Sequence, residues 1–172
     1  MPDLARINRM SPDEFSALFG AVYEHSPWIA QRAFQQRDGR PFDSAADLAL
    51  ALYRVVREAT PAEQLALIRS HPELAGKEAQ AGALTTESTR EQSRAGLNRL
   101  SPELASELRQ LNADYQQRFG FPFILCARQN SRDAIFGTLR ARLHNDVDQE
   151  LQITLSQIGE IARLRVMDIL SD

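Results

Sequence analysis

Helix-start signals recur along the chain and constrain its fold more than any other feature. A serine or threonine followed by proline and acidic residues occurs at residues 11–14, 60–63 and 101–103. The hydroxyl can cap the first turn, the proline fits the first helical position, and a glutamate three residues after the cap completes a capping box. Between these starts the apolar residues recur at helical spacing, which predicts a series of amphipathic helices.

The turn and cap residues divide the chain into roughly eight expected helices. Gly120 is expected to end one of them in the left-handed conformation, and Pro27 to end another near Ser26. The expected helices run over residues 11–26, 28–36, from the cap Ser44, 60–70, from about 87, 101–120, 131–143 and 146–170. We find no internal repeat, linker or low-complexity segment. The prediction is an all-α, single-domain helical bundle covering residues 1–172.

One segment departs from the helical pattern. Residues 121–127 (FPFILCA) form a continuous apolar run that is typical of extended structure. Pro122 cannot donate to a sheet ladder, so the run is expected to be a short extended segment and not a central strand.

Composition excludes several classes of function. The 172 residues carry a net charge of -3, with 20 basic and 23 acidic residues, which is a poor match to nucleic-acid binding. No apolar run reaches the roughly 20 residues that span a bilayer, and no apolar leader is visible at the N-terminus. A single cysteine, Cys126, suits a reducing compartment. We therefore expect a cytoplasmic protein with no membrane or nucleic-acid partner.

The stretch from residue 71 to residue 97 differs from the surrounding sequence, which has helical periodicity. His71 precedes a proline, which ends the incoming helix and places the histidine in a turn, where we expect its side chain to have little packing. If the helix restarts near residue 87, then Ser88, Glu91, Gln92 and Ala95 share one face. That face carries a hydroxyl, a carboxylate and an amide where an ordinary helix carries leucine. A polar face near a helix-end histidine indicates a small-molecule site.

Other interpretations of these residues remain open. Ser88, Glu91 and Gln92 would also suit a solvent-exposed helix face on which neighbouring arginines form local ion pairs. His25 and His144 match ordinary surface or capping histidines.

Metal and nucleotide sites fit the sequence poorly. No H-x-x-x-H, Cys-x-x-Cys or dense carboxylate loop is present, so no metal site is predicted. The glycine-rich phosphate loop and the G-x-S-x-G motif are absent as well.

Arg165 interrupts an apolar helical stripe. It follows Ile158 and Ile161 at helical spacing, so its guanidinium is expected to point inward. A buried cation needs a partner, and an anionic ligand or Glu91 would serve. Arg163 points off the stripe and is the competing candidate.

These segments together resemble one family. The chain is similar to the decarboxylase of urate catabolism, which acts on 2-oxo-4-hydroxy-4-carboxy-5-ureidoimidazoline (OHCU) and yields (S)-allantoin. The resemblance covers nearly the whole chain, and its motifs occur in the family's order. The motifs are residues 71–77 (HPELAGK), Ser88-x-x-Glu91-Gln92 with residues 95–97 (AGL), Asn112-x-x-Tyr115, residues 118–123 (RFGFPF) and Ile161-x-x-Leu164-Arg165.

The resemblance implies an all-α lyase that needs no cofactor or metal, binds OHCU and allantoin as small molecules, and forms a homodimer. It implies a cytoplasmic enzyme of urate degradation, since the C-terminal residues do not match a peroxisomal signal. The implied catalytic residues are His71 and Glu91. The implied substrate-binding residues are Pro72, Ser88, Gln92, Phe123, Leu125 and Arg165, with Phe123 and Leu125 acting through backbone amides.

Two alternative functions follow from the same residues. A related cofactor-free enzyme acting on another ureide or hydantoin would use the same polar face. A non-catalytic helical interaction module would instead present an exposed apolar groove, and the inward-pointing Arg165 argues against it.

Overall fold

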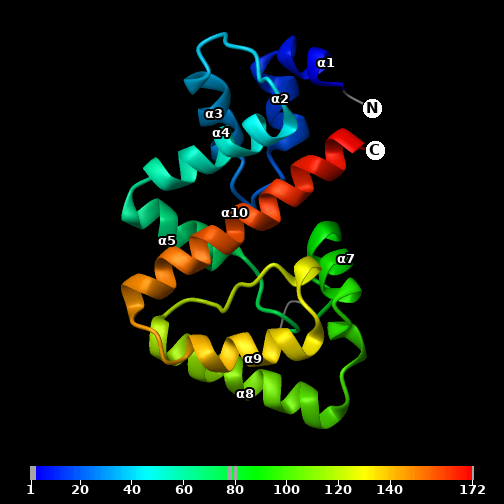
Figure 1. The fold of residues 1–172 in the computed structure, drawn as a ribbon, viewed down its shortest axis with the longest axis vertical. Helices are drawn as coiled ribbons and strands as arrows, with labels where there is room; N and C mark the ends of the chain where they lie inside the picture. Colours follow the sequence, from blue (N-terminus) through cyan, green and yellow to red (C-terminus); the bar gives the residue numbers. More distant parts are fainter. Residues whose placement is uncertain (1–2, 77–78, 80, 172) are drawn as a thin grey trace. The chain divides into compact units, whose positions relative to one another are not determined.

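Helices account for all regular structure in the computed structural model, which describes residues 3–76, 79 and 81–171 (Figure 1). Within this part of the chain there are nine α-helices, two short 3₁₀ helices and no strand. The all-α prediction is therefore confirmed. Lys77, which belongs to the HPELAGK motif, lies outside the described residues.

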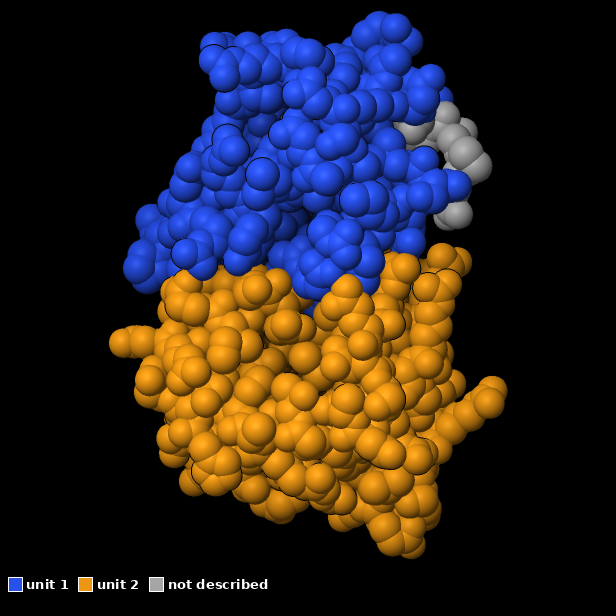
Figure 2. All heavy atoms as spheres, in the orientation of Figure 1, with its two compact units in different colours: residues 1–70, 158–172 blue, residues 71–157 orange. Residues whose placement is uncertain are grey.

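The chain divides into two compact units, coloured separately in Figure 2. Unit 1 comprises residues 1–70 and 158–172, and unit 2 comprises residues 71–157. The long helix α10 (Val147–Ser171) contributes residues to both units. The single-domain organisation expected from the sequence stays a prediction.

Unit 1 is built from short helices that follow one another along the chain. Helix α2 packs against α3, and α3 packs against α4. Its helices are α1 (Leu4–Asn8), α2 (Pro12–Phe19), α3 (Trp28–Gln36), α4 (Ala45–Glu58), α5 (Pro61–Ser70) and the second part of α10. The ring centroids of Phe15 and Phe19 lie 4.7 Å apart in its core, and one face of α4 is buried, namely Leu48, Leu52, Val55 and Val56.

The predicted helix starts are confirmed by their hydrogen bonds. The backbone N–H of Glu14 donates to the hydroxyl of Ser11, and the N–H of Ser11 donates to the Glu14 carboxylate. Thr60 and Glu63 make the same reciprocal pair at the start of α5. Each pair satisfies backbone donors that a helix start otherwise leaves without a partner.

The expected end of the first long helix was wrong. Helix α2 stops at Phe19 and turns occupy the residues up to 25. The carbonyl of Val22 accepts a hydrogen bond from Arg165 at 3.2 Å, so it faces the guanidinium and not a helical N–H. The segment between α2 and α3 is thus shaped by a contact with α10 inside unit 1.

Unit 2 packs its helices around a non-helical segment. Helices α8 (Pro102–Phe119) and α9 (Arg132–Arg142) lie side by side in Figure 1. Gly120 ends α8 with φ 76°, the left-handed cap predicted from the sequence. The remaining elements are α7 (Thr86–Arg94), the 3₁₀ helices η1 (Leu97–Arg99) and η2 (Ala127–Gln129), and the first part of α10.

The apolar run after Gly120 is irregular, as predicted. Residues 122–126 have no helix or strand assignment, and the segment leads from the end of α8 to η2 and the start of α9 (Figure 1). Among the described residues, no helix is both long enough and apolar enough to cross a membrane.

Candidate active site

His71 begins unit 2, directly after α5 ends at Ser70. Only 6% of its surface is exposed, so the expectation that its side chain has little packing was wrong. The loop that follows His71 folds back onto α7 and α8.

Two side-chain amides hold this loop in place. Gln92 of α7 accepts a hydrogen bond from the N–H of Ala75 at 2.7 Å, and Asn112 of α8 donates to the carbonyl of Leu74 at 3.0 Å. Ala75 has φ 51°, a left-handed conformation that costs an L-residue roughly 1–2 kcal/mol. The loop carrying His71 is therefore fixed in a strained shape by residues from two helices.

The polar face of α7 points inward, as the spacing predicted. Ser88 and Gln92 are 5% and 6% exposed, and Glu91 is half-buried. Thr85 caps the helix through a hydrogen bond from the N–H of Ser88. The alternative of a fully solvated helix face is wrong, because two of its three polar members are buried.

The irregular segment leads into a short turn that contacts the same helix. The 3₁₀ turn η2, which follows the segment directly, packs against α7. Phe123, Ile124 and Leu125 are 0%, 3% and 6% exposed. Within the described chain, the backbone N–H groups of these three residues have no hydrogen-bond partner. Buried donors without partners are rare in proteins, and such donors are typical of a site that binds the acceptor atoms of a ligand.

A buried charged network lies behind this segment. Arg142 of α9 donates from Nη1 to the carbonyl of Ile124 at 2.7 Å, and its Nη2 lies 2.8 Å from the Glu150 carboxylate. Tyr115 donates a short hydrogen bond to Glu150, and Thr154 accepts one from Arg142 at 3.0 Å. Burial, and then the hydrogen bond to Glu150, raise the pKa of Tyr115 to about 12, so that its hydroxyl stays protonated.

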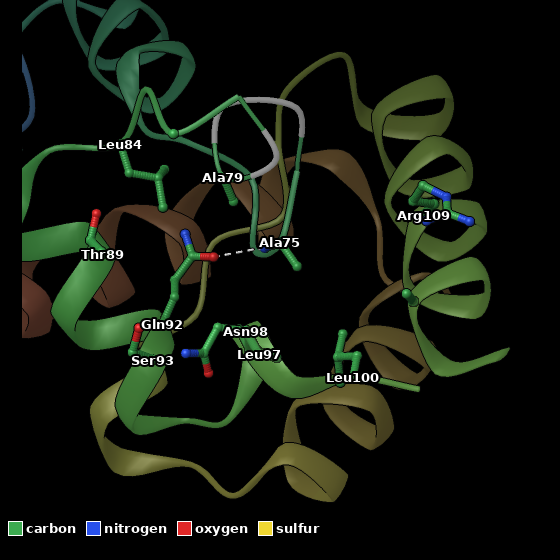
Figure 3. A pocket seen from close by; sticks show the side chains of 12 residues that line it. Ala75, Ala79, Leu84, Thr89, Gln92, Ser93, Leu97, Asn98, Leu100 and Arg109 are labelled. Carbon is green, nitrogen blue, oxygen red and sulfur yellow. Dashed lines mark hydrogen bonds between the residues drawn. The ribbon is translucent and has the colours of Figure 1, made fainter. Parts of the chain in front are cut away.

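A pocket of about 430 Å³ lies beside the loop around Ala75 (Figure 3). It is lined by the loop around Ala75 and by residues of α7, η1 and α8, and Figure 3 shows Gln92 reaching across to Ala75. Of the predicted site residues, its lining includes Gln92 alone. Thr89, Ser93 and Asn98 supply further polar groups.

Arg165 lies in unit 1 and is buried, as its position in the stripe predicted. Its Nη2 lies 3.0 Å from the carboxylate of Glu24. Neither partner suggested by the sequence, a ligand or Glu91, is needed to explain its burial. Arg163 instead pairs with Glu160 one helical turn away.

Unit 2 thus contains the His71 loop, the polar face of α7 and the 121–126 segment, whereas Arg165 belongs to unit 1. In the part of the chain described, no group of three or more His, Cys, Asp or Glu residues is placed to hold a metal ion.

Sequence reasoning named Asn112 only as part of a family motif. It missed Arg142, Glu150 and Glu24 as residues that hold these segments in place. A signal existed for Glu150, since it and Thr154 precede Ile158 at four-residue spacing on the buried face of α10.

Comparison with known proteins adds an independent result. The sequence model of a family described as OHCU decarboxylase matches residues 8–167. A protein of Amia calva named 2-oxo-4-hydroxy-4-carboxy-5-ureidoimidazoline decarboxylase is 39% identical over 168 residues, which cover 98% of this chain and 94% of that protein.

Two solved structures share the fold. One, titled as a crystal structure of (S)-allantoin synthase, has a TM-score of 0.80 and 22% identity over 99% of this chain and 54% of its own. Another, titled as a crystal structure of OHCU decarboxylase in the presence of (S)-allantoin, has a TM-score of 0.67 and 22% identity over 93% of this chain and 99% of its own.

Proposed function

The chain belongs to the OHCU decarboxylase family, and from this premise we propose how its residues carry out the decarboxylation of OHCU in urate degradation. One observation carries the assignment of residues. The hydrogen bond between Gln92 and Ala75 ties the His71 loop to the polar face of α7. A titratable imidazole and a buried polar face thereby belong to one local structure.

The reaction needs proton transfer and a place for negative charge. The bond between the ring carbon and the carboxylate breaks, and its electron pair forms a double bond to the neighbouring carbon. The electrons of the adjacent C=N bond move to nitrogen, which takes up a proton as CO₂ leaves. The resulting enol then loses its hydroxyl proton and gains one on the neighbouring carbon, which gives allantoin.

We assign the proton transfers to His71. An imidazole has an ordinary pKa of about 6.5 and can either accept or donate a proton at neutral pH. To Glu91 we assign the role of orienting the imidazole or of holding the substrate hydroxyl, and its position on the same face of α7 as Ser88 and Gln92 supports this. Delivery of the last proton from one face would make the product (S)-allantoin.

The substrate's carbonyl and ureido groups would be bound by the remaining predicted residues. Ser88 and Gln92 supply a hydroxyl and an amide, and Pro72 shapes the turn beside His71. The N–H groups of Phe123 and Leu125 are buried donors without partners among the described residues, so they suit ring carbonyl oxygens. The predicted role of Arg165 is to bind the anionic substrate.

We also propose that the protein works without a cofactor or metal, forms a homodimer and is located in the cytoplasm. The chemistry supports the first, since the C=N bond of the substrate itself accepts the electrons. Light scattering at several protein concentrations tests the dimer, and a constant mass of one chain would refute it.

The decisive experiment supplies freshly generated OHCU to the purified protein and follows the circular dichroism of the allantoin formed. We expect a signal of one sign that appears faster than the uncatalysed reaction. An unchanged rate and a racemic product would contradict the proposal. A panel of other ureides and hydantoins separates the alternative substrate class, since faster turnover of one of these would favour it.

A further inference from the structure

The peptide group between Ile124 and Leu125 is held from one side by a buried arginine. Nη1 of Arg142 donates to the carbonyl oxygen of Ile124 at 2.7 Å, and this carbonyl belongs to the same peptide group as the N–H of Leu125. The peptide bond is trans, so its carbonyl and its N–H point in opposite directions. Arg142 therefore sets the direction in which the N–H of Leu125 points, which is away from α9.

The next peptide group is held in the complementary way. The N–H of Cys126 donates to Oε1 of Gln157 at 3.0 Å, so the carbonyl of Leu125 also points away from that contact. Two successive peptide groups are thus fixed by side chains of α9 and α10. Such fixation needs no regular sheet, which explains how an irregular segment keeps a defined backbone.

The guanidinium is itself held rigidly. All three of its nitrogens have partners: Nε donates to Glu150 at 2.9 Å, Nη1 to Ile124, and Nη2 to Thr154. Its carbon lies 4.6 Å from the centre of the Phe123 ring. Both charged side chains are nearly inaccessible, with Arg142 at 5% and Glu150 at 0% exposure. A charge-assisted hydrogen bond in such surroundings also polarises the peptide it contacts, which strengthens the N–H on the opposite side as a donor.

We propose that Arg142 and Glu150 are positioning residues for the decarboxylation, which orient and polarise the Ile124–Leu125 peptide so that the Leu125 N–H meets the negative charge that develops on the substrate. The inference rests on the proposed function. Neither residue touches the substrate. Their effect passes through one peptide group, and it is greatest in the transition state, where charge has moved into the ring.

The test removes the pair without leaving an unpaired buried charge. Replacing a buried ion pair by apolar residues of similar volume is often neutral or stabilising, so the double variant Arg142→Met/Glu150→Met is expected to fold. We expect its kcat for OHCU to fall about tenfold or more, with a smaller change in KM, because the donor is misdirected but not deleted. Leu139→Ala and Ile135→Val, both buried on α9, serve as controls for lost stability and should retain kcat.

A second measurement reports on the peptide itself. Adding allantoin to labelled wild-type protein should shift the amide NMR signal of Leu125, and the shift should shrink in the double variant. If the double variant does not fold, Arg142→Lys takes its place. Lysine cannot reproduce the planar set of donors, so kcat should still fall.

The outcomes separate the two claims. A wild-type protein that fails to turn over OHCU would refute the proposed function. An active wild type whose folded double variant, or Arg142→Lys variant, keeps the same kcat would refute the positioning role alone.

Discussion

Arg165 and Glu24 form a buried ion pair within unit 1, with the guanidinium Nη2 3.0 Å from the carboxylate and exposures of 5% and 2%. The pair joins α10 to the segment between α2 and α3, and Arg165 also donates to the carbonyl of Val22 in that segment. Replacing one partner of such a buried ion pair lowers the stability of the protein. Replacing both partners by apolar residues of similar volume is often neutral or stabilising.

Arg165→Met should destabilise the protein, because it removes the guanidinium that pairs with the buried Glu24 carboxylate. We expect a loss of roughly 3–5 kcal/mol in the free energy of unfolding by urea titration. The double variant Glu24→Met/Arg165→Met should recover much of it. Arg163→Met is the matched control, since its partly exposed pair with Glu160 contributes only about 0–1 kcal/mol. Allantoin titrations of the double variant then report whether Arg165 binds the substrate as well.

His71→Asn should lower kcat by about 10² or more if His71 transfers protons. Because His71 is buried, the melting temperature of the variant must be measured first, and His71→Ala gives a second variant of different volume. The exposed His144→Asn is the control. A folded His71→Asn protein with wild-type turnover would remove His71 from the mechanism.

Gln92 can act through the loop or on the substrate, and two substitutions distinguish these roles. Gln92→Glu keeps an acceptor for the N–H of Ala75, whereas Gln92→Leu removes it and should cost about 1–2 kcal/mol of stability. If the role is confined to the loop, Gln92→Glu should retain most of kcat/KM. A large loss of kcat/KM in a stable Gln92→Glu protein would instead indicate direct substrate contact.

Glu63 should contribute to acid sensitivity. Its hydrogen bond from Arg32, followed by that from the Thr60 N–H, lowers the pKa of the carboxyl from 4.5 to about 2. A lowered folded-state pKa stabilises the protein above about pH 4.5, and this stabilisation is lost as the pH falls towards 2. Thermal melts between these pH values should show a smaller decrease for Glu63→Gln than for wild type, and identical decreases would contradict the assignment.

Exhaustive chelation should leave turnover of OHCU unchanged, since the chemistry assigned to His71 and Glu91 requires no metal. The assay compares initial rates before and after dialysis against chelator. Activity that disappears and returns with one divalent ion would overturn this expectation.

Local features of the fold were predictable because their causes are local. Ser11 and Glu14 lie three residues apart and satisfy each other's backbone donors, so the helix start could be identified from the sequence. The inward polar face of α7 followed from helical spacing for the same reason.

Contacts between distant residues could not be predicted in this way. The burial of Arg165 could be predicted because it follows apolar residues at helical spacing. Its partner Glu24 could not, because it lies 141 positions away in a segment that was expected to be helical. The hydrogen bond from Arg142 to the carbonyl of Ile124 depends on how α9 packs against an irregular segment. A periodic sequence pattern does not reveal this packing.

The division of unit 1 into two chain segments has a consequence for synthesis on the ribosome. Residues 1–70 emerge first, yet their unit is completed only by residues 158–172. Glu24 therefore lacks Arg165 until residue 165 has been translated, whereas unit 2 is continuous and ends at residue 157. Domains generally fold from the N-terminus first during synthesis. In this protein the later-made unit can reach its native structure before the earlier one.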